Sequence, residues 1–188
     1  QYLPLLELSV AEDPEDDRNL HYLGREYLYY GRWDDCIRTL TRHLALPSAV
    51  WRDERAASMR YIARAHAQKG ERDEARDWYL RAAAEAPHLR EPWVDLAMLL
   101  YEDQEWDGVL YATACALKIR ERPRTYICEA EAWGGLPHDL RCQAYYHTGR
   151  LPQALEEARL ALAAAPSDPR LAGNAELLEK MAGLAGEL

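Results

Sequence analysis

The feature that most constrains this chain is a two-helix pattern of about 34 residues that recurs along it. Its clearest copy runs from Arg55 to Pro87, with a turn at Lys69-Gly70-Glu71. On either side of the turn, small or apolar residues recur three to four positions apart, the spacing that places side chains on one face of a helix. One such hairpin buries only part of its apolar face. The pattern therefore predicts successive hairpins stacked into one continuous core.

Aligning the helix-to-helix turns predicts four hairpins. Gly31, Gly70 and Gly149 each lie in such a turn, where glycine adopts a left-handed backbone at little cost. The predicted repeats cover residues 17–47, 56–87, 90–120 and 135–166. Between the last two we expect a short inserted helix over 125–133. Beyond the last repeat, apolar residues at helical spacing predict a capping helix over 169–186.

The composition favours a chain made of helices alone. Ala, Leu, Arg and Glu dominate, and all four are good helix formers, whereas β-branched residues are scarce. The chain has 188 residues, 48% of them hydrophobic, which is enough for one core. We therefore predict an all-α fold, an α-solenoid of about four hairpins forming a single domain over residues 1–188.

Charge and hydropathy exclude two classes of partner. The formal net charge of −9 argues against a general nucleic-acid binder, which needs a basic surface. No stretch of the sequence has the apolar length of a membrane span. Because the chain begins with Gln1 rather than Met, we expect it to be an excised or processed piece of a longer polypeptide.

The four cysteines match neither a disulfide framework nor a zinc framework, because no two of them form a CxxC pair. Cys36 and Cys142 fall at positions where a repeat requires a small side chain. We interpret all four as reduced packing residues of a cytoplasmic protein.

The repeat pattern resembles the tetratricopeptide repeat. Two stretches, RNLHYLGREYLYYGRWDDCI near the amino end and TYICEAEAWGGLPHDLRCQAYYHTGRLPQAL, also look like a region that follows the catalytic domain of bacterial family-2 glycosyltransferases. The resemblance covers about Arg18 to Asn174. It implies an accessory module without the active site, since this chain contains neither an alternating strand-and-helix pattern nor an Asp-x-Asp metal motif.

The tetratricopeptide resemblance also implies a binding groove. In that family, six positions of each repeat's first helix line the concave surface. Carried over to this sequence, they place an Arg and Tyr band on the first two repeats, with a more acidic lining on the later ones. The candidate groove residues are Arg18, His21, Tyr22, Arg25, Tyr29, Arg60, Tyr61, Arg64 and Tyr101.

We hypothesise that this band binds an anionic group, such as a peptide carboxylate, an acidic protein segment or a phosphate. Arg offers a fork of donors that suits carboxylate and phosphate, and Tyr offers contact area at low entropic cost. The alternative is that the arginines are paired within the protein, with Glu26, Asp53 and Glu54 as candidate partners.

The sequence shows no catalytic constellation, metal site or cofactor motif. His138, Cys142 and His147 are close in sequence, but a stable zinc site needs about four well-placed ligands, and Cys142 lies at a packing position. Gly134-Gly135 follows no strand, so it is not a phosphate-binding loop. We expect no catalytic residue, no metal and no cofactor in this chain.

These observations favour a protein-binding module that serves a bacterial glycosyltransferase, either positioning its acceptor or mediating self-association. The alternative is a free-standing adaptor that binds an acidic peptide or a C-terminal carboxylate in its groove. A third interpretation, an enzyme that catalyses sugar transfer by itself, is disfavoured because the sequence shows neither metal-binding carboxylates nor a nucleotide-binding fold.

Overall fold

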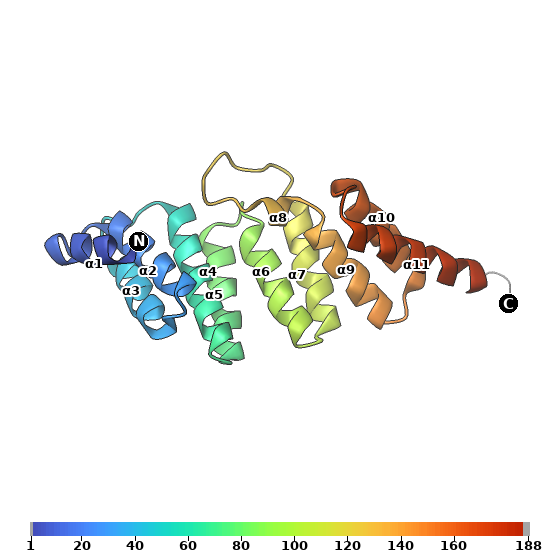
Figure 1. The fold of residues 1–188 in the computed structure, drawn as a ribbon, viewed down its shortest axis with the longest axis horizontal. Coiled ribbons are helices and arrows are strands. Elements are labelled where there is room, and N and C mark those ends of the chain that lie inside the picture. Colours follow the sequence, from blue (N-terminus) through green and yellow to red (C-terminus); the bar gives the residue numbers. More distant parts are fainter. Residues whose placement is uncertain (1, 186–188) are drawn as a thin grey trace. The chain divides into compact units, whose positions relative to one another are not determined.

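The computed structural model describes residues 2–185, and every regular element in this range is an α-helix (Figure 1). The predicted all-α fold is therefore confirmed. The helices are α1 (Leu3–Glu12), α2 (Asp17–Tyr29), α3 (Trp33–Ala45), α4 (Arg52–Gln68), α5 (Arg72–Glu85), α6 (Glu91–Glu102), α7 (Trp106–Lys118), α8 (Ala130–Trp133), α9 (Leu136–His147), α10 (Leu151–Ala164) and α11 (Pro169–Ala185). They divide into two compact units, unit 1 (Gln1–Pro87) and unit 2 (His88–Leu188).

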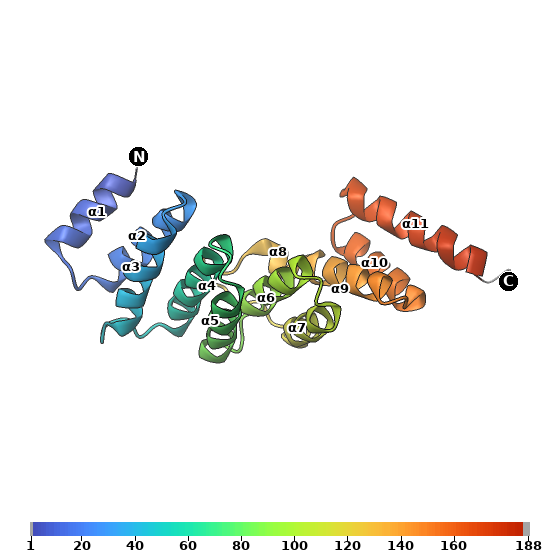
Figure 2. The same ribbon diagram turned by 90° about the horizontal axis from the view of Figure 1, so that it is seen from below.

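Unit 1 contains two antiparallel hairpins, α2–α3 and α4–α5, with α1 packed on α2 (Figures 1 and 2). Helix α3 also packs on α4, and the two first helices, α2 and α4, contact each other. Contact between the first helices of successive hairpins is what aligns their exposed faces into one surface.

Unit 2 repeats this arrangement with the hairpins α6–α7 and α9–α10 (Figure 2). The first helices α6 and α9 contact each other, α7 packs on α9, and α11 packs on α10. The short helix α8 lies against α9. Among the helices of the described range, none has both the length and the apolarity that crossing a membrane requires.

The predicted turns have the expected backbone. Gly31, Gly70 and Gly149 adopt φ angles of +71°, +79° and +74°, which only glycine adopts without steric cost. The turn between α6 and α7 has no glycine, and Gln104 takes the left-handed conformation there with φ +58°. That turn could not be found by searching for glycine.

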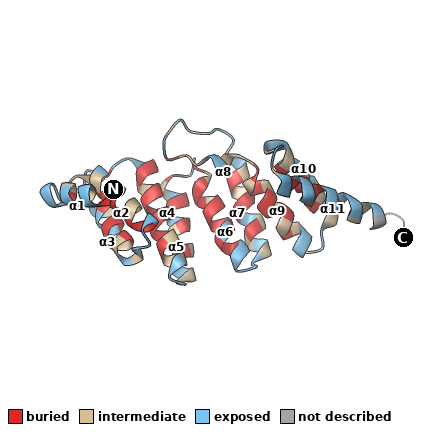
Figure 3. Ribbon diagram, in the orientation of Figure 1, coloured by how far each residue is buried: buried red, intermediate tan, exposed pale blue. Residues whose placement is uncertain are grey.

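Small side chains set the distance between paired helices. A Cβ atom built on Gly24 would lie 2.3 Å from Cδ2 of Leu40, so α2 and α3 approach closely only because this position is glycine. Ala75 and Ala82 on α5 are fully buried, as are Cys36 on α3 and Leu40. Figure 3 shows buried residues in red as stripes along the helices.

The inserted helix is shorter than predicted. We expected helix over 125–133, but α8 covers only Ala130–Trp133, and residues before it form an arch beyond the ends of α6 and α7 (Figure 1). Two contacts explain the difference. The Thr125 hydroxyl accepts from Ile127 N at 3.2 Å, a local bond that competes with helix. Glu129 N donates to the carboxylate of Glu91 at 3.0 Å instead of to a helical carbonyl.

The predicted capping helix is present as α11, which begins at Pro169. Its predicted last residue, number 186, lies outside the described residues. The amino-terminal apolar stretch forms α1, and α4 begins at Arg52, four residues ahead of the repeat frame that starts at Ala56.

Candidate functional site

The predicted Arg and Tyr band lies on α2 and α4 of unit 1. His21 on α2 joins the two helices, because its ring centroid is 5.6 Å from that of Tyr22 and 5.8 Å from that of Tyr61 on α4. The structure thus brings the predicted residues of the two repeats together around one buried imidazole. Tyr101, the ninth predicted residue, lies in unit 2.

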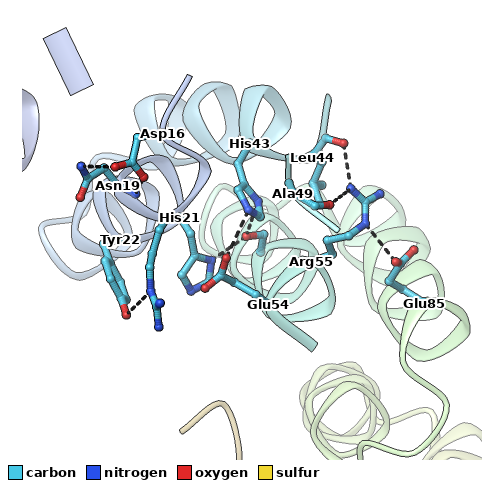
Figure 4. Close-up of polar contacts among 12 residues, drawn as sticks. Asp16, Asn19, His21, Tyr22, His43, Leu44, Ala49, Glu54, Arg55 and Glu85 are labelled. Atoms are coloured by element: carbon cyan, nitrogen blue, oxygen red, sulfur yellow. Dashed lines mark hydrogen bonds and ion pairs between the residues drawn. The ribbon is translucent and has the colours of Figure 1, made fainter. Parts of the chain in front are cut away.

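His21 belongs to a chain of buried polar groups that links α2, α4 and α3 (Figure 4). Its Nδ1 lies 2.8 Å from the hydroxyl of Ser58, and that hydroxyl lies 3.0 Å from Nδ1 of His43. The other ring nitrogen of His43, Nε2, lies 3.6 Å from Oε1 of Glu54. His21, Ser58 and His43 are all 0% exposed, so the two Nδ1 atoms and the hydroxyl depend on one another for hydrogen bonds.

Burial lowers the pKa of His21 to about 4, well below its ordinary 6.5. The carboxylate of Glu54 opposes this shift, whereas His43, Arg25 and Arg18 add to it by repelling a positive imidazole. His21 is therefore neutral at neutral pH. A neutral imidazole cannot itself bind an anion by charge, so that role falls to the arginines.

Arg25 is the arginine of the band best placed to meet a ligand. Its guanidinium carbon lies 5.1 Å from the ring centroid of Tyr22 and 6.0 Å from that of Tyr29. Its side chain is 30% exposed, and its ion pair with Glu26 is loose, with Nη2 and Oε1 3.6 Å apart. Glu26, one of the three acids expected to pair with the arginines, is thus the observed partner of Arg25.

The remaining band residues differ in exposure. Arg18 is exposed, and its Nε donates to the Tyr22 hydroxyl at 3.4 Å. Arg64 is half-buried and lies 5.8 Å from the ring of Tyr61. Arg60 and Tyr61, expected to line the groove, are 0% and 8% exposed, so they support the surface rather than form it. His21 is buried in the same way, whereas Tyr29 is 65% exposed.

Unit 2 contains a hollow of about 490 Å³ between α6, α9 and α11. We call it the α6–α9–α11 groove. It is lined by Met98, Tyr101, Glu102, Leu136, Asp139, Leu140, Gln143, Arg170 and Asn174. A smaller hollow of about 120 Å³ adjoins it, shares Gln143 and Asn174, and adds Tyr146 and Leu177 to the lining.

The groove combines apolar walls with two side-chain amides. Neither the Gln143 amide nor the Asn174 amide has a hydrogen bond to another described residue, and both are half-buried. Asp139, by contrast, is paired, because Oδ2 accepts from Nη1 of Arg170 at 2.7 Å. Two unengaged amides, each with donors and an acceptor, are suited to bind the backbone of an extended peptide.

An aromatic row lies beside the groove on α6, α7 and α9. The Trp106 ring stacks on His147 with centroids 4.3 Å apart and an interplanar angle of 8°. Trp106 also contacts Tyr101 edge-on at 5.7 Å, and His147 contacts Tyr146 edge-on at 5.4 Å. These contacts hold Tyr101 and Tyr146 at the edge of the groove while leaving both rings partly exposed.

The contribution of α11 to the groove was not predicted from the sequence. This segment was predicted as a capping helix, but Arg170, Asn174 and Leu177 line the two hollows. The signal was present, because a repeat frame that starts at Pro169 would place these three residues at the groove positions used for the earlier repeats. Helix α11 therefore acts as the first helix of a further repeat.

The residues considered for a metal site near α9 have other contacts. Nδ1 of His138 lies 2.7 Å from Oε2 of Glu157, and His147 stacks on Trp106. Burial raises the pKa of Cys142 to about 11, and Asp139 and Glu157 add to the shift. Cys142 is thus a neutral packing residue at neutral pH, as is Cys36, whose pKa burial raises to about 12.

Solved structures of helical repeat proteins resemble this chain. The crystal structure of MamA is 19% identical over 86% of this chain and 85% of its own, with a TM-score of 0.68. The fold is that of a tetratricopeptide-like solenoid. TTC0263, a thermophilic tetratricopeptide protein of Thermus thermophilus, is 19% identical over 94% of this chain and 88% of its own, with a TM-score of 0.63.

A third similar structure is YrrB, a tetratricopeptide protein with an unusual peptide-binding site. It is 13% identical over 95% of this chain and 84% of its own, with a TM-score of 0.66. No protein-family model matches the sequence, and no curated protein matches it. At these identities the likeness establishes the fold of the solenoid and leaves its ligand open.

We predict that protonation of His21 destabilises the protein between pH 7 and pH 5. The unfolded chain takes up this proton near pH 6.5, but the folded chain only near pH 4. The contribution of His21 to the free energy of unfolding is therefore fully present above about pH 6.5. It decreases as the pH falls, by about 2 kcal/mol from pH 7 to pH 5. Urea titrations at both pH values measure the loss, which His21→Gln should reduce. An equal loss in the variant would contradict the assignment to His21.

Proposed function

We propose that this protein is a binding module whose α6–α9–α11 groove takes an extended segment of a partner protein. The observation that carries the proposal is the pair of unengaged amides, Gln143 and Asn174, inside a hollow with apolar walls. An extended segment needs partners for its backbone donors and acceptors, and the two amides supply both.

The walls of the groove add contacts for side chains. Met98 is 42% exposed and Tyr146 is 40% exposed, so both present apolar surface to a ligand. Leu136 and Leu140 lie deeper and offer a site for an apolar side chain. Burying apolar surface supplies affinity, whereas the amides set the register of the bound segment.

We further propose that the Arg and Tyr band of unit 1 binds an anionic group. Arg25 supports this proposal, because it is partly exposed, lies over two tyrosine rings and forms a loose ion pair with Glu26 at 3.6 Å. A carboxylate or phosphate that accepts from its guanidinium would make a shorter, charge-assisted hydrogen bond.

Whether the module is attached to a catalytic domain is a separate proposal. The resemblance of its inserted segment supports an accessory role beside the catalytic domain of a bacterial glycosyltransferase, where it would position the acceptor or mediate self-association. The free-standing adaptor is equally compatible with the fold. Free cysteines, among them the buried Cys36 and Cys142, support a reducing, cytoplasmic setting.

Replacing the groove amides should weaken peptide binding. Peptides selected on the immobilised protein from a random display library are measured by calorimetry against wild type, Gln143→Ala and Asn174→Ala. We expect each variant to lose about 5- to 100-fold in affinity, because peptide backbone groups would be left without partners. Gln153→Ala, an exposed amide on α10 outside the groove, is the matched control. Equal affinity of all four proteins would exclude the groove as the peptide-binding site.

Replacing Arg25 and Arg64 together should abolish the preference for anionic ligands. With a peptide that carries a C-terminal carboxylate or a phosphate, the double variant to Ala should lose about tenfold or more in affinity. The pair Arg38→Ala and Arg81→Ala removes the same charge from α3 and α5 and is the control. If both double variants lose affinity equally, the effect is one of net charge and the band is not the site.

The two settings predict different native polypeptides. An immunoblot of the native organism should show a product much larger than the 21.6 kDa of this chain if a catalytic domain is attached. A product of about that size would favour the free-standing adaptor. The measurement is independent of both binding experiments.

A further inference from the structure

Three potential metal ligands converge in unit 1, away from the α6–α9–α11 groove. They are Asp17, His43 and Glu54, and their ligand atoms all lie within 4.8 Å of one another. Asp17 is the first residue of α2, His43 lies in the last turn of α3, and Glu54 lies in the first turn of α4. We propose that this group binds a divalent transition-metal ion, with zinc preferred.

His43 provides an observation that is independent of the two acids. Its side chain is 0% exposed, and its Nε2 has no hydrogen-bond partner among the described residues although it points toward Glu54 (Figure 4). The separation of 3.6 Å between Nε2 and Oε1 of Glu54 is too long for a hydrogen bond. It is close to the spacing of about 3.3 Å between neighbouring ligands that follows from tetrahedral bonds of about 2.0–2.1 Å to zinc.

The other ring nitrogen of His43 has the kind of outer partner that a metal-binding histidine uses. Nδ1 of His43 lies 3.0 Å from the hydroxyl of Ser58. A ligating histidine donates its second N–H to an outer partner, which fixes the tautomer and leaves the other nitrogen free to bind metal. Ser58 can accept this bond and donate its own proton to Nδ1 of His21, 2.8 Å away. The hydroxyl then pairs with Nδ1 of both imidazoles, and Nε2 of His43 presents a lone pair.

The preference of acidic residues for the first turn of a helix does not by itself account for this arrangement. Asp17 and Glu54 are acids in the first turns of their helices, where the dipole favours negative charge. That explains each charge singly, but not why three helices direct their ligand atoms to one point. An ion bound there would join both helices of the first hairpin to the first helix of the second.

The ligand set selects the kind of metal. Imidazole favours zinc, cobalt, nickel and copper over magnesium and calcium, which prefer oxygen alone. Two carboxylates with one imidazole carry enough negative charge to neutralise a divalent ion. Three protein ligands leave at least one position of the ion to a water molecule. The proposed site differs from the prediction of no metal, which was based on His138, Cys142 and His147.

Zinc binding by the full 188-residue chain, first treated with a chelator, tests the proposal. Calorimetry should show one equivalent of Zn²⁺ bound, and the unfolding midpoint should rise by about 5–10 °C at a zinc concentration about a hundred times the dissociation constant. His43→Gln should lower the affinity at least about tenfold. Asp17→Asn should do the same, and because Asp17 is only half-buried, this variant keeps the test valid if His43→Gln does not fold.

His138→Gln is the matched control, since His138 also lies next to a carboxylate but has no third ligand within the described residues. It should bind zinc as tightly as wild type. Cobalt titration identifies the ligands, because a cysteine ligand adds an intense near-ultraviolet charge-transfer band. Absence of saturable binding, affinity unchanged in Asp17→Asn and His43→Gln, or a thiolate band would each overturn the proposal.

Discussion

Close approach of paired helices at small side chains is the constraint on which this structure depends. Gly24 admits Leu40 to within a distance that any Cβ atom would block, and Ala75 and Ala82 serve the same purpose on α5. Where large side chains meet small ones, helices can lie near one another at native packing density. The first helices of each unit are then adjacent, so residues far apart in sequence share one exposed face.

Buried polar groups hold in position the segments whose packing the repeat pattern does not specify. Glu91 is 0% exposed and accepts from Glu129 N and from Nε1 of Trp133, at 3.0 and 2.8 Å. A buried carboxylate without such donors would be costly, so these bonds hold the inserted segment against α6. In unit 1 the hydroxyl of Ser58 has the corresponding role, since it connects the imidazoles of α2 and α3 through α4.

The two units use similar helix faces for different chemistry. In unit 1 the face between α2 and α4 is occupied by aromatic rings and a buried imidazole, so its outer layer consists of a few charged groups such as Arg25. In unit 2 the corresponding face is hollow, with amides and apolar walls. The same repeat frame therefore supports a charged surface in one unit and an extended groove in the other.

The amino-acid sequence by itself determined the helix pairs, three of their turns and the small packing residues, because periodicity and glycine are local signals. It also placed Arg25 and Tyr29 on one helix face. It could not show that Arg60 is buried, that Arg170 and Asn174 of α11 complete a groove, or that Thr125 and Glu91 shorten the inserted helix to Ala130–Trp133. The convergence of Asp17, His43 and Glu54 was equally hidden. Each of these depends on which side chains meet across helices, and only tertiary packing decides that.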